Sequence, residues 1–169
     1  MPRLTPATGL LLALALGVSG CSSYRLGTGS KPAFASLSVE PVVNRTVLPQ
    51  AEALFSARLR EAFIRDGRVP TVSSGGAATL TVAITDFRRD VAAVREGDTG
   101  LARKFNLTLT ASATLRETSS GRLLWDRRSF TVTREAFTDG GQLQSEYQTL
   151  PLLAETLAQR VAQAALDTW

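Results

Sequence analysis

The order of hydrophobic patterns along the chain predicts an α+β fold, a two-layer sandwich with the element order β-α-β-β-β-α. Two stretches repeat apolar residues at intervals of three and four, as helices do, and four stretches alternate apolar with polar residues, as half-buried strands do. Each of these elements has a single apolar face. Such faces are buried when two layers pack together, so we expect a mixed four-stranded sheet with two helices packed on one face, in a single domain over residues 33–169.

The domain is expected to open with a strand over residues 34–43, in which apolar and polar residues mostly alternate. Pro41 favours an edge position or a bulge near the end of this strand. Residues 49–66 have the helical period, and Gly67 is expected to end the helix as a left-handed cap. The apolar residues that share one face of this helix are Leu54, Phe55, Leu59, Ala62 and Phe63.

Three further strands are predicted after this helix. The first covers residues 79–85 and follows a turn at residues 73–76. The second has the longest alternation in the chain, over residues 104–115, and a tight turn at residues 118–121 joins it to the third, over residues 123–137. One face of these strands is rich in Thr, Ser and Arg, and we expect that face to point outward.

Two irregularities are expected in this part of the chain. Leu124 and Trp125 fall on opposite phases of the alternation, which predicts a β-bulge near Asp126. Residues 88–100 mix charges of both signs with two glycines and are expected to form a loop between the second and third strands. Such a loop is either a binding loop or a plain extended hairpin connection, and the sequence leaves both open.

The last element is a predicted helix over residues 143–167. Pro151 is unusual within it, so the helix either starts near Thr149 or is kinked in its first turn. The apolar residues at helical spacing are Tyr147, Leu150, Ala154, Leu157, Val161, Ala165 and Leu166.

The amino terminus has the features of an export signal. Residues 1–20 are predicted to be a signal peptide, because a short positive start precedes an apolar run far below the roughly 20 residues that span a bilayer. The only cysteine, Cys21, directly follows Val18-Ser19-Gly20, an arrangement that resembles the bacterial lipobox. In lipobox proteins this Cys sulfur carries a diacylglycerol, the preceding peptide is cleaved and the new amino terminus is acylated. We therefore expect residues 21–32 to form a lipidated tether, the alternative being a buried free cysteine behind an ordinary signal.

The residue after the cysteine bears on the location of the protein. Ser22 stands at the position where enterobacterial lipoproteins that stay in the inner membrane tend to have Asp. By that resemblance, we expect the protein to be anchored in the outer membrane through lipidated Cys21, on the periplasmic side.

The composition excludes several classes of site. The 169 residues include no histidine and one cysteine, so the chain has no His-containing catalytic triad, no His-ligated metal site and no internal disulfide. Removal of residues 1–20 takes Arg3 from the 19 basic residues, so 18 basic and 15 acidic side chains remain, a net charge of +3. We therefore predict that the protein is not an enzyme, has no cofactor or metal, and does not bind nucleic acid.

Arginine dominates the basic residues, with 17 arginines and two lysines. Its planar guanidinium suits phosphate and carboxylate oxygens, so a basic edge of the sheet could hold an anionic lipid head group. The alternative is a solvated face combined with a compositional bias toward arginine. The candidate lipopolysaccharide-binding residues are Arg88, Arg89, Arg103, Lys104, Arg127 and Arg128.

Several segments, in this order, resemble the LptE family of lipopolysaccharide-assembly lipoproteins. The segments are Cys21 followed by Tyr24-Arg25-Leu26, Val39-Glu40-Pro41-Val42-Val43-Asn44-Arg45-Thr46, the Leu54/Leu59/Phe63 helix pattern, Ala77-Ala78 before Leu80-Thr81-Val82, residues 121–125, and Leu153-Ala154-Glu155 with Leu157-Ala158. The resemblance implies a non-catalytic partner of the large outer-membrane β-barrel LptD, within which it acts as a plug and assembly factor and contacts lipopolysaccharide on its way to the outer leaflet.

Two other functions remain open at this stage. One is an envelope lipoprotein that activates a peptidoglycan synthase or supports a secretion complex. The other is an enzyme that acts on a cell-wall substrate, for which the sequence offers no nucleophile motif.

Overall fold

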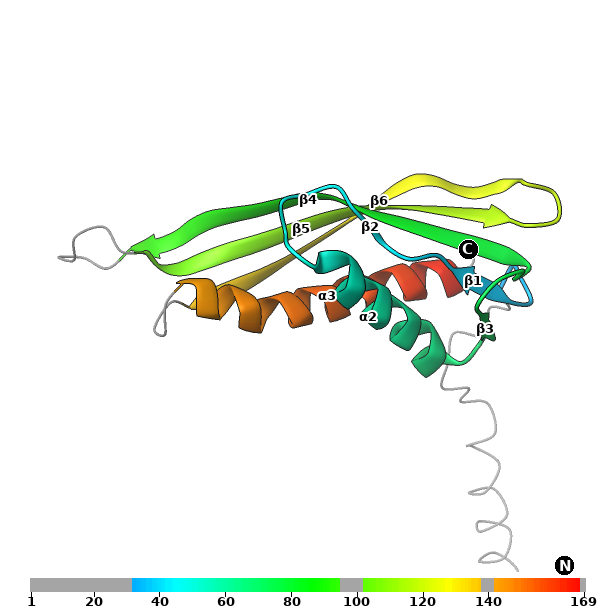
Figure 1. The fold of residues 1–169 in the computed structure, drawn as a ribbon, viewed down its shortest axis with the longest axis horizontal. Coiled ribbons are helices and arrows are strands. Elements are labelled where there is room, and N and C mark those ends of the chain that lie inside the picture. Colours follow the sequence, from blue (N-terminus) through cyan, green and yellow to red (C-terminus); the bar gives the residue numbers. More distant parts are fainter. Residues whose placement is uncertain (1–31, 95–101, 138–141, 168–169) are drawn as a thin grey trace, which may run out of the picture.

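The fold has two layers, a sheet and a pair of helices that cover one of its faces (Figure 1). The computed structural model describes residues 32–94, 102–137 and 142–167. Along the chain the elements are β1 (Leu37–Val39), β2 (Val43–Asn44), α2 (Ala51–Asp66), β3 (Thr71–Val72), β4 (Ala78–Val94), β5 (Ala102–Glu117), β6 (Leu123–Phe137) and α3 (Gln142–Leu166). The α+β class is therefore confirmed.

The sheet has six strands, so the predicted number of four is wrong. The additional strands, β2 and β3, have two residues each, which is too short for an alternating pattern to stand out in the sequence. The strand order is β3-β1-β4-β5-β6, and β2 also pairs with β4. Pairing is parallel among β1, β2, β3 and β4 and antiparallel from β4 through β5 to β6, so the sheet is mixed as expected.

Strand β4 is much longer than predicted. It has 17 residues and includes Arg88 and Arg89, which were expected in a loop. The sequence pattern does not reveal this continuation, because there is a register shift between Ile84 and Asp86, where Thr85 has no partner in β5. This extra residue reverses the phase of the alternation, so Phe87 continues the apolar face on which Ile84 lies, although the sequence pattern stops there.

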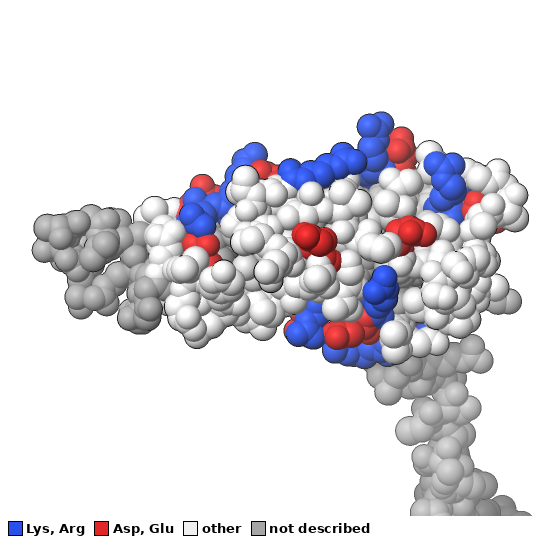
Figure 2. Space-filling view, in the orientation of Figure 1, with Lys and Arg blue, Asp and Glu red and all other residues white. Residues whose placement is uncertain are grey.

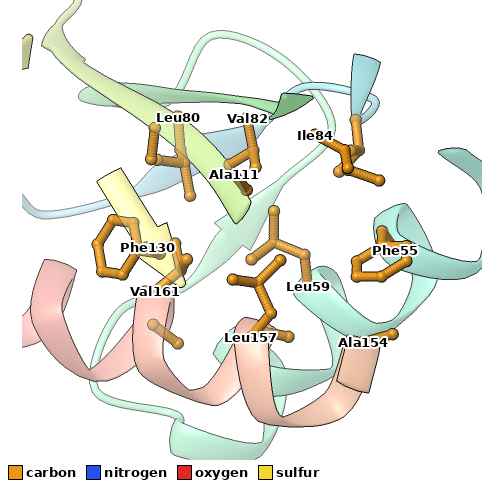
Figure 3. Packing of buried hydrophobic residues seen from close by; sticks show 14 of the residues in the cluster. Phe55, Leu59, Leu80, Val82, Ile84, Ala111, Phe130, Ala154, Leu157 and Val161 are labelled. Carbon is orange, nitrogen blue, oxygen red and sulfur yellow. The ribbon is translucent and has the colours of Figure 1, made fainter. Parts of the chain in front are cut away.

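The core lies between the sheet and the helices (Figure 3). From α2 it receives Phe55 and Leu59, and from α3 it receives Leu157 and Val161, all buried. These side chains point toward a row of buried residues on β4 that includes Val82 (Figure 3). The apolar faces predicted for α2 and β5 are therefore confirmed.

Two predicted local features are also confirmed. Gly67 ends α2 in the left-handed region, at φ 71°, and its N–H donates to the Phe63 carbonyl. On β6, Trp125 lies opposite Leu115 and Arg128 lies opposite Ala113. Two residues of β6, Asp126 and Arg127, therefore lie opposite one residue of β5, which is the bulge predicted near Asp126. Within this bulge Arg127 has a positive φ of 46°.

Helix α3 runs through Pro151, so the alternative in which it starts near Thr149 is wrong. An internal proline costs a helix roughly 3 kcal/mol, and the turns before it must be held by other contacts. Ser145, Glu146 and Thr149 are buried there, and Glu146 is bound by Arg89 of β4.

Tyr147 does not belong to the buried stripe of α3, because 60% of it is exposed. Helix α2 starts only at Ala51, nearer the middle of the sheet, whereas α3 extends further along it (Figure 1). The first turns of α3 therefore have no neighbouring helix among the described residues.

Arg68 joins the ends of the two helices. Its Nε lies 2.7 Å from Asp66 Oδ1, its Nη2 donates to Asp66 Oδ2, and its Nη1 lies 2.7 Å from Asp167 Oδ1. The hydrogen bonds from Arg68 lower the pKa of Asp66 below its ordinary value of 3.8, against a smaller opposing effect of burial. The pair therefore stabilises the fold fully above that pH, and this contribution is lost as the pH falls through the lowered folded-state pKa.

We expect Asp66→Asn to reduce the free energy of unfolding by about 1 kcal/mol at pH 7. We also expect the variant to lose less stability than the wild type between pH 5 and pH 2. Urea unfolding at several pH values measures both effects, and Arg68→Met should flatten the pH dependence in the same way. If both variants lost as much stability as the wild type between pH 5 and pH 2, this contact would not contribute to acid unfolding.

Candidate functional site

The six candidate basic residues do not form one cluster. Arg128 lies opposite Ala113 of β5 and Arg89 lies opposite Leu107, six residues away along the strand, which is roughly 20 Å. Cys21 lies outside the described residues, and Arg103 lies in β5 with no description of its side chain. The remaining candidates divide between the two faces and the two ends of the β4-β5-β6 sheet.

Arg88 and Arg89 point to opposite faces of the sheet because they are consecutive residues of a strand. The Arg88 side chain is 70% exposed and its Nε lies 2.7 Å from the Asp86 carboxylate. Lys104 forms an ion pair with Glu135 of β6. An exposed pair of this kind contributes about 0–1 kcal/mol, and it partly neutralises the cation toward a ligand.

Arg89 faces the helices, where it makes a forked contact with Glu146 of α3. Its Nη2 donates to Glu146 Oε2 at 2.6 Å, and its Nε contacts Glu146 Oε1. The Glu146 side chain is only 11% exposed. Removal of Arg89 would leave this carboxylate buried without its partner, so Arg89 holds α3 against β4.

Arg128 is the candidate whose surroundings best suit a ligand. Its guanidinium carbon lies 5.0 Å from the ring centroid of Trp125 and 5.5 Å from that of Phe130, on the helix side of β6. The two rings are themselves in contact, with centroids 5.8 Å apart. Within the described part of the chain, no carboxylate forms an ion pair with Arg128, so its donors remain available to an anion.

A hollow of about 280 Å³ adjoins Arg128 at this end of the domain. Leu124, Trp125 and Phe34 give it apolar walls, and the alanines of the last turn of α3 close it. Asp167 also lines it, but this carboxylate is bound by Arg68 at 2.7 Å. An apolar hollow with a guanidinium at its rim suits an amphiphile that carries an acyl chain and an anionic group. We refer to these residues as the Arg128 pocket.

The sequence contained a signal for part of this pocket. The predicted bulge near Asp126 places Trp125 and Arg128 on the same face, whereas unbroken alternation would separate residues three apart. The contribution of Phe34 could not be read from the sequence, since it comes from the segment before β1 and meets β6 only through the fold.

The sheet face opposite to the helices is polar, as expected. Threonines on β5 and β6 pair across the strands, with hydroxyl oxygens 3.0 Å apart for Thr108 and Thr133 and 3.2 Å apart for Thr110 and Thr131. Along the upper margin of Figure 2, where Figure 1 shows the sheet, Lys and Arg alternate with acidic residues. No helix covers this face among the described residues, so it is open to a polar partner surface.

Residue 44 organises the connection between β2 and α2. The Asn44 side chain donates to the Leu48 carbonyl at 2.7 Å and accepts hydrogen bonds from the backbone N–H and the hydroxyl of Thr46. In the sequence Asn44 is part of the segment that carries the family resemblance. These contacts close the turn between Asn44 and Leu48.

The described residues contain no group of three or more Cys, Asp or Glu side chains that could hold a metal ion. Over the same ranges no helix is both long and apolar enough to cross a membrane.

Comparison with known proteins shows similar folds at low sequence identity. Protein XCC0632 from Xanthomonas campestris is 14% identical, with a TM-score of 0.62, over 82% of this chain and 88% of that chain. The PelC dodecamer from Paraburkholderia phytofirmans is 19% identical, with a TM-score of 0.51, over 85% and 96% of the two chains. A minor lipoprotein from Acinetobacter baumannii is 17% identical, with a TM-score of 0.51, over 78% and 93%.

The search of curated proteins gives no match. The family comparison does give one: residues 34–165 match the LptE family, described as lipopolysaccharide-assembly. This match covers most of the chain and almost all of the described domain. The chain therefore belongs to the LptE lipopolysaccharide-assembly family.

Proposed function

We propose that this protein is a lipid-anchored subunit of the outer membrane, that it partners a large LptD-like β-barrel as its plug and assembly factor, and that it contacts lipopolysaccharide during its insertion into the outer leaflet. The family match over residues 34–165 carries this proposal. Lipidated Cys21, behind a signal peptide at residues 1–20, supplies the anchor on the periplasmic side. The role is non-catalytic and needs no cofactor.

Two features of the structure support the role of a plug. The open sheet face presents paired threonine hydroxyls and ion pairs, and the lumen of a large outer-membrane barrel is polar. The domain also packs its hydrophobic core between the sheet and the helices, away from the polar sheet face that would meet the lumen.

Co-purification tests the proposed partner. The full chain with a carboxy-terminal tag, extracted in mild detergent, is expected to bring down a large β-barrel protein in a fixed stoichiometric ratio. An unrelated tagged lipoprotein of the same membrane serves as the control. A preparation without such a barrel, or with equal recovery by the control, would refute the proposal.

The Arg128 pocket is the proposed contact for lipopolysaccharide. We expect Arg128→Gln to weaken lipopolysaccharide binding about tenfold, because a charge-assisted hydrogen bond contributes about 1.5–3 kcal/mol. Binding of purified lipopolysaccharide to the full chain, measured by surface plasmon resonance, gives the affinity. Arg122→Gln is the matched control, since Arg122 is exposed and paired with Glu117 at the end of β5.

Equal binding by Arg128→Gln and the wild type would remove Arg128 from the contact surface. Arg88→Gln tests the outer face in the same assay, and Arg127→Gln tests the bulge. Arg89 is unsuited to this test, because its loss disturbs the buried Glu146 and thereby the start of α3.

A further inference from the structure

Among the described residues, nothing covers an apolar slot at the end of the sheet opposite to the Arg128 pocket. It has a volume of about 360 Å³ and is bounded by Val47, Phe87 and Leu143, with the Arg89–Glu146 pair at its base. Val47 is 95% exposed and Leu143 is 68% exposed. Helix α2 starts at Ala51, nearer the middle of the sheet than the start of α3 (Figure 1). We call this hollow the distal slot.

The slot lies beside an unpaired strand edge. On this side of β4, β1 pairs with residues 78–80 and β2 pairs with residues 83–84. The last backbone hydrogen bond runs from Arg45 N to the Ile84 carbonyl, at 3.0 Å. In the described part of the chain, no segment pairs with residues 86–94 on this side.

The register shows which backbone groups lie at this edge. The Leu80 and Ile84 carbonyls face β1 and β2, and the shift at Thr85 reverses the phase after them. Backbone groups alternate in direction along an antiparallel pair, so the N–H and C=O groups of Phe87, Arg89 and Val91 point to the open edge. The side chains of these three residues are on the helix face, beside the distal slot.

We infer that the distal edge of β4 binds an extended segment of a partner protein by strand addition. The segment satisfies the backbone groups of Phe87, Arg89 and Val91, and it continues the sheet from the point where β2 ends. Because its side chains alternate, every second one enters the distal slot against Phe87 and Leu143. The occupant is therefore an extended segment with apolar residues at alternate positions.

A strand fits this place better than a helix does. A helix could cover the slot but would leave the backbone groups of the edge unpaired, at the cost of unsatisfied donors and acceptors. The other edge of the sheet, β6, differs in this respect. There Arg160 of α3 donates to the Thr131 carbonyl at 2.7 Å, so one acceptor of that edge already has a partner.

This inference goes beyond the proposed function, because it concerns neither the anchor nor lipopolysaccharide. Peptide binding at the β4 edge can be found in a protein that co-purifies no barrel, and it can be absent in one that does. Failure of this inference is therefore distinguishable from failure of the proposed function.

The probe is a nine-residue peptide that alternates valine and threonine, with lysine at each end and both termini blocked. The control peptide has proline in place of the central valine, which removes one backbone donor. Binding to the full chain in detergent is measured by fluorescence anisotropy, and amide hydrogen exchange is followed by NMR. We expect binding of the probe, at least tenfold weaker binding of the control, and slower exchange at Phe87, Arg89 and Val91.

Two matched variants complete the test. Val91→Pro removes an edge N–H without breaking a β4–β5 hydrogen bond, and we expect it to weaken probe binding at least tenfold. Thr133→Pro makes the same change at the free edge of β6, and we expect no effect on binding. Absence of probe binding, or equal loss in the two variants, would overturn the inference. Slow exchange of the same amides in a dimer of this chain, without peptide, would also overturn the inference. The occupant of the edge would then be a second copy of this chain.

Discussion

Replacement of Cys21 by alanine is expected to move the protein from the membrane fraction to the soluble fraction. Each buried methylene of an acyl chain contributes about 0.8 kcal/mol, so the several chains of a lipidated cysteine anchor the protein stably. In the proposed function this cysteine is the point at which the protein is attached to the bilayer. The effect on membrane attachment is therefore expected to be nearly complete.

Fractionation of cell envelopes with an antibody to the carboxy terminus measures the shift. Mass spectrometry of the mature wild type should show an acylated Cys21, and the variant should carry no acyl chain at this position. Ser22→Ala is the matched control, since it changes the neighbouring residue and keeps the cysteine. Tight membrane attachment of the alanine variant would contradict lipidation at this position.

Phe63→Ala is expected to reduce the free energy of unfolding by about 3–5 kcal/mol. Phe63 lies in the last turn of α2 and is 1% exposed. Its removal loses buried apolar surface and leaves a cavity between the helix and the sheet. A domain of this size has a stability of about 5–15 kcal/mol, so the variant should be close to unfolding.

The neighbouring residue gives a sharp control. Ile64 is 69% exposed, and we expect Ile64→Ala to change stability by about 0.5 kcal/mol or less. Urea unfolding followed by circular dichroism measures both variants, and the midpoint should fall for Phe63→Ala with little change in slope. A similar loss in the two variants would show that α2 does not pack on the sheet through this face.

The parts of the fold that could be predicted from the sequence are those in which one pattern extends over many residues. Helix α2 and strand β5 each keep a single apolar face from end to end, so their positions follow from periodicity. Strands β2 and β3 have two residues each and carry no period. The sequence left the start of α3 open between residue 143 and Thr149, because Pro151 opposes helix formation locally, whereas the burial of Glu146 and its neighbours depends on contacts with β4.

The candidate site was predictable in composition but not in arrangement. A strand pattern cannot show that Arg89 has a partner 57 residues away in Glu146. It also cannot show that Arg88 and Arg89 serve different faces when both are expected in a loop. The one irregularity that was predicted, the bulge near Asp126, is the one that places Arg128 beside Trp125. The signal peptide, the lipidated tether and the six binding residues stay predictions.

The shift at Thr85 also bears on which changes of length this strand can absorb. Because Thr85 is the extra residue opposite β5, its deletion would remove the bulge and leave Arg88 opposite Thr108 and Arg89 opposite Leu107, each on its present face. Deletion of Phe87 with the bulge kept would instead turn Arg89 to the outer face and separate it from Glu146. LptE sequences can therefore differ in length at Thr85 without a change in the face of each basic residue.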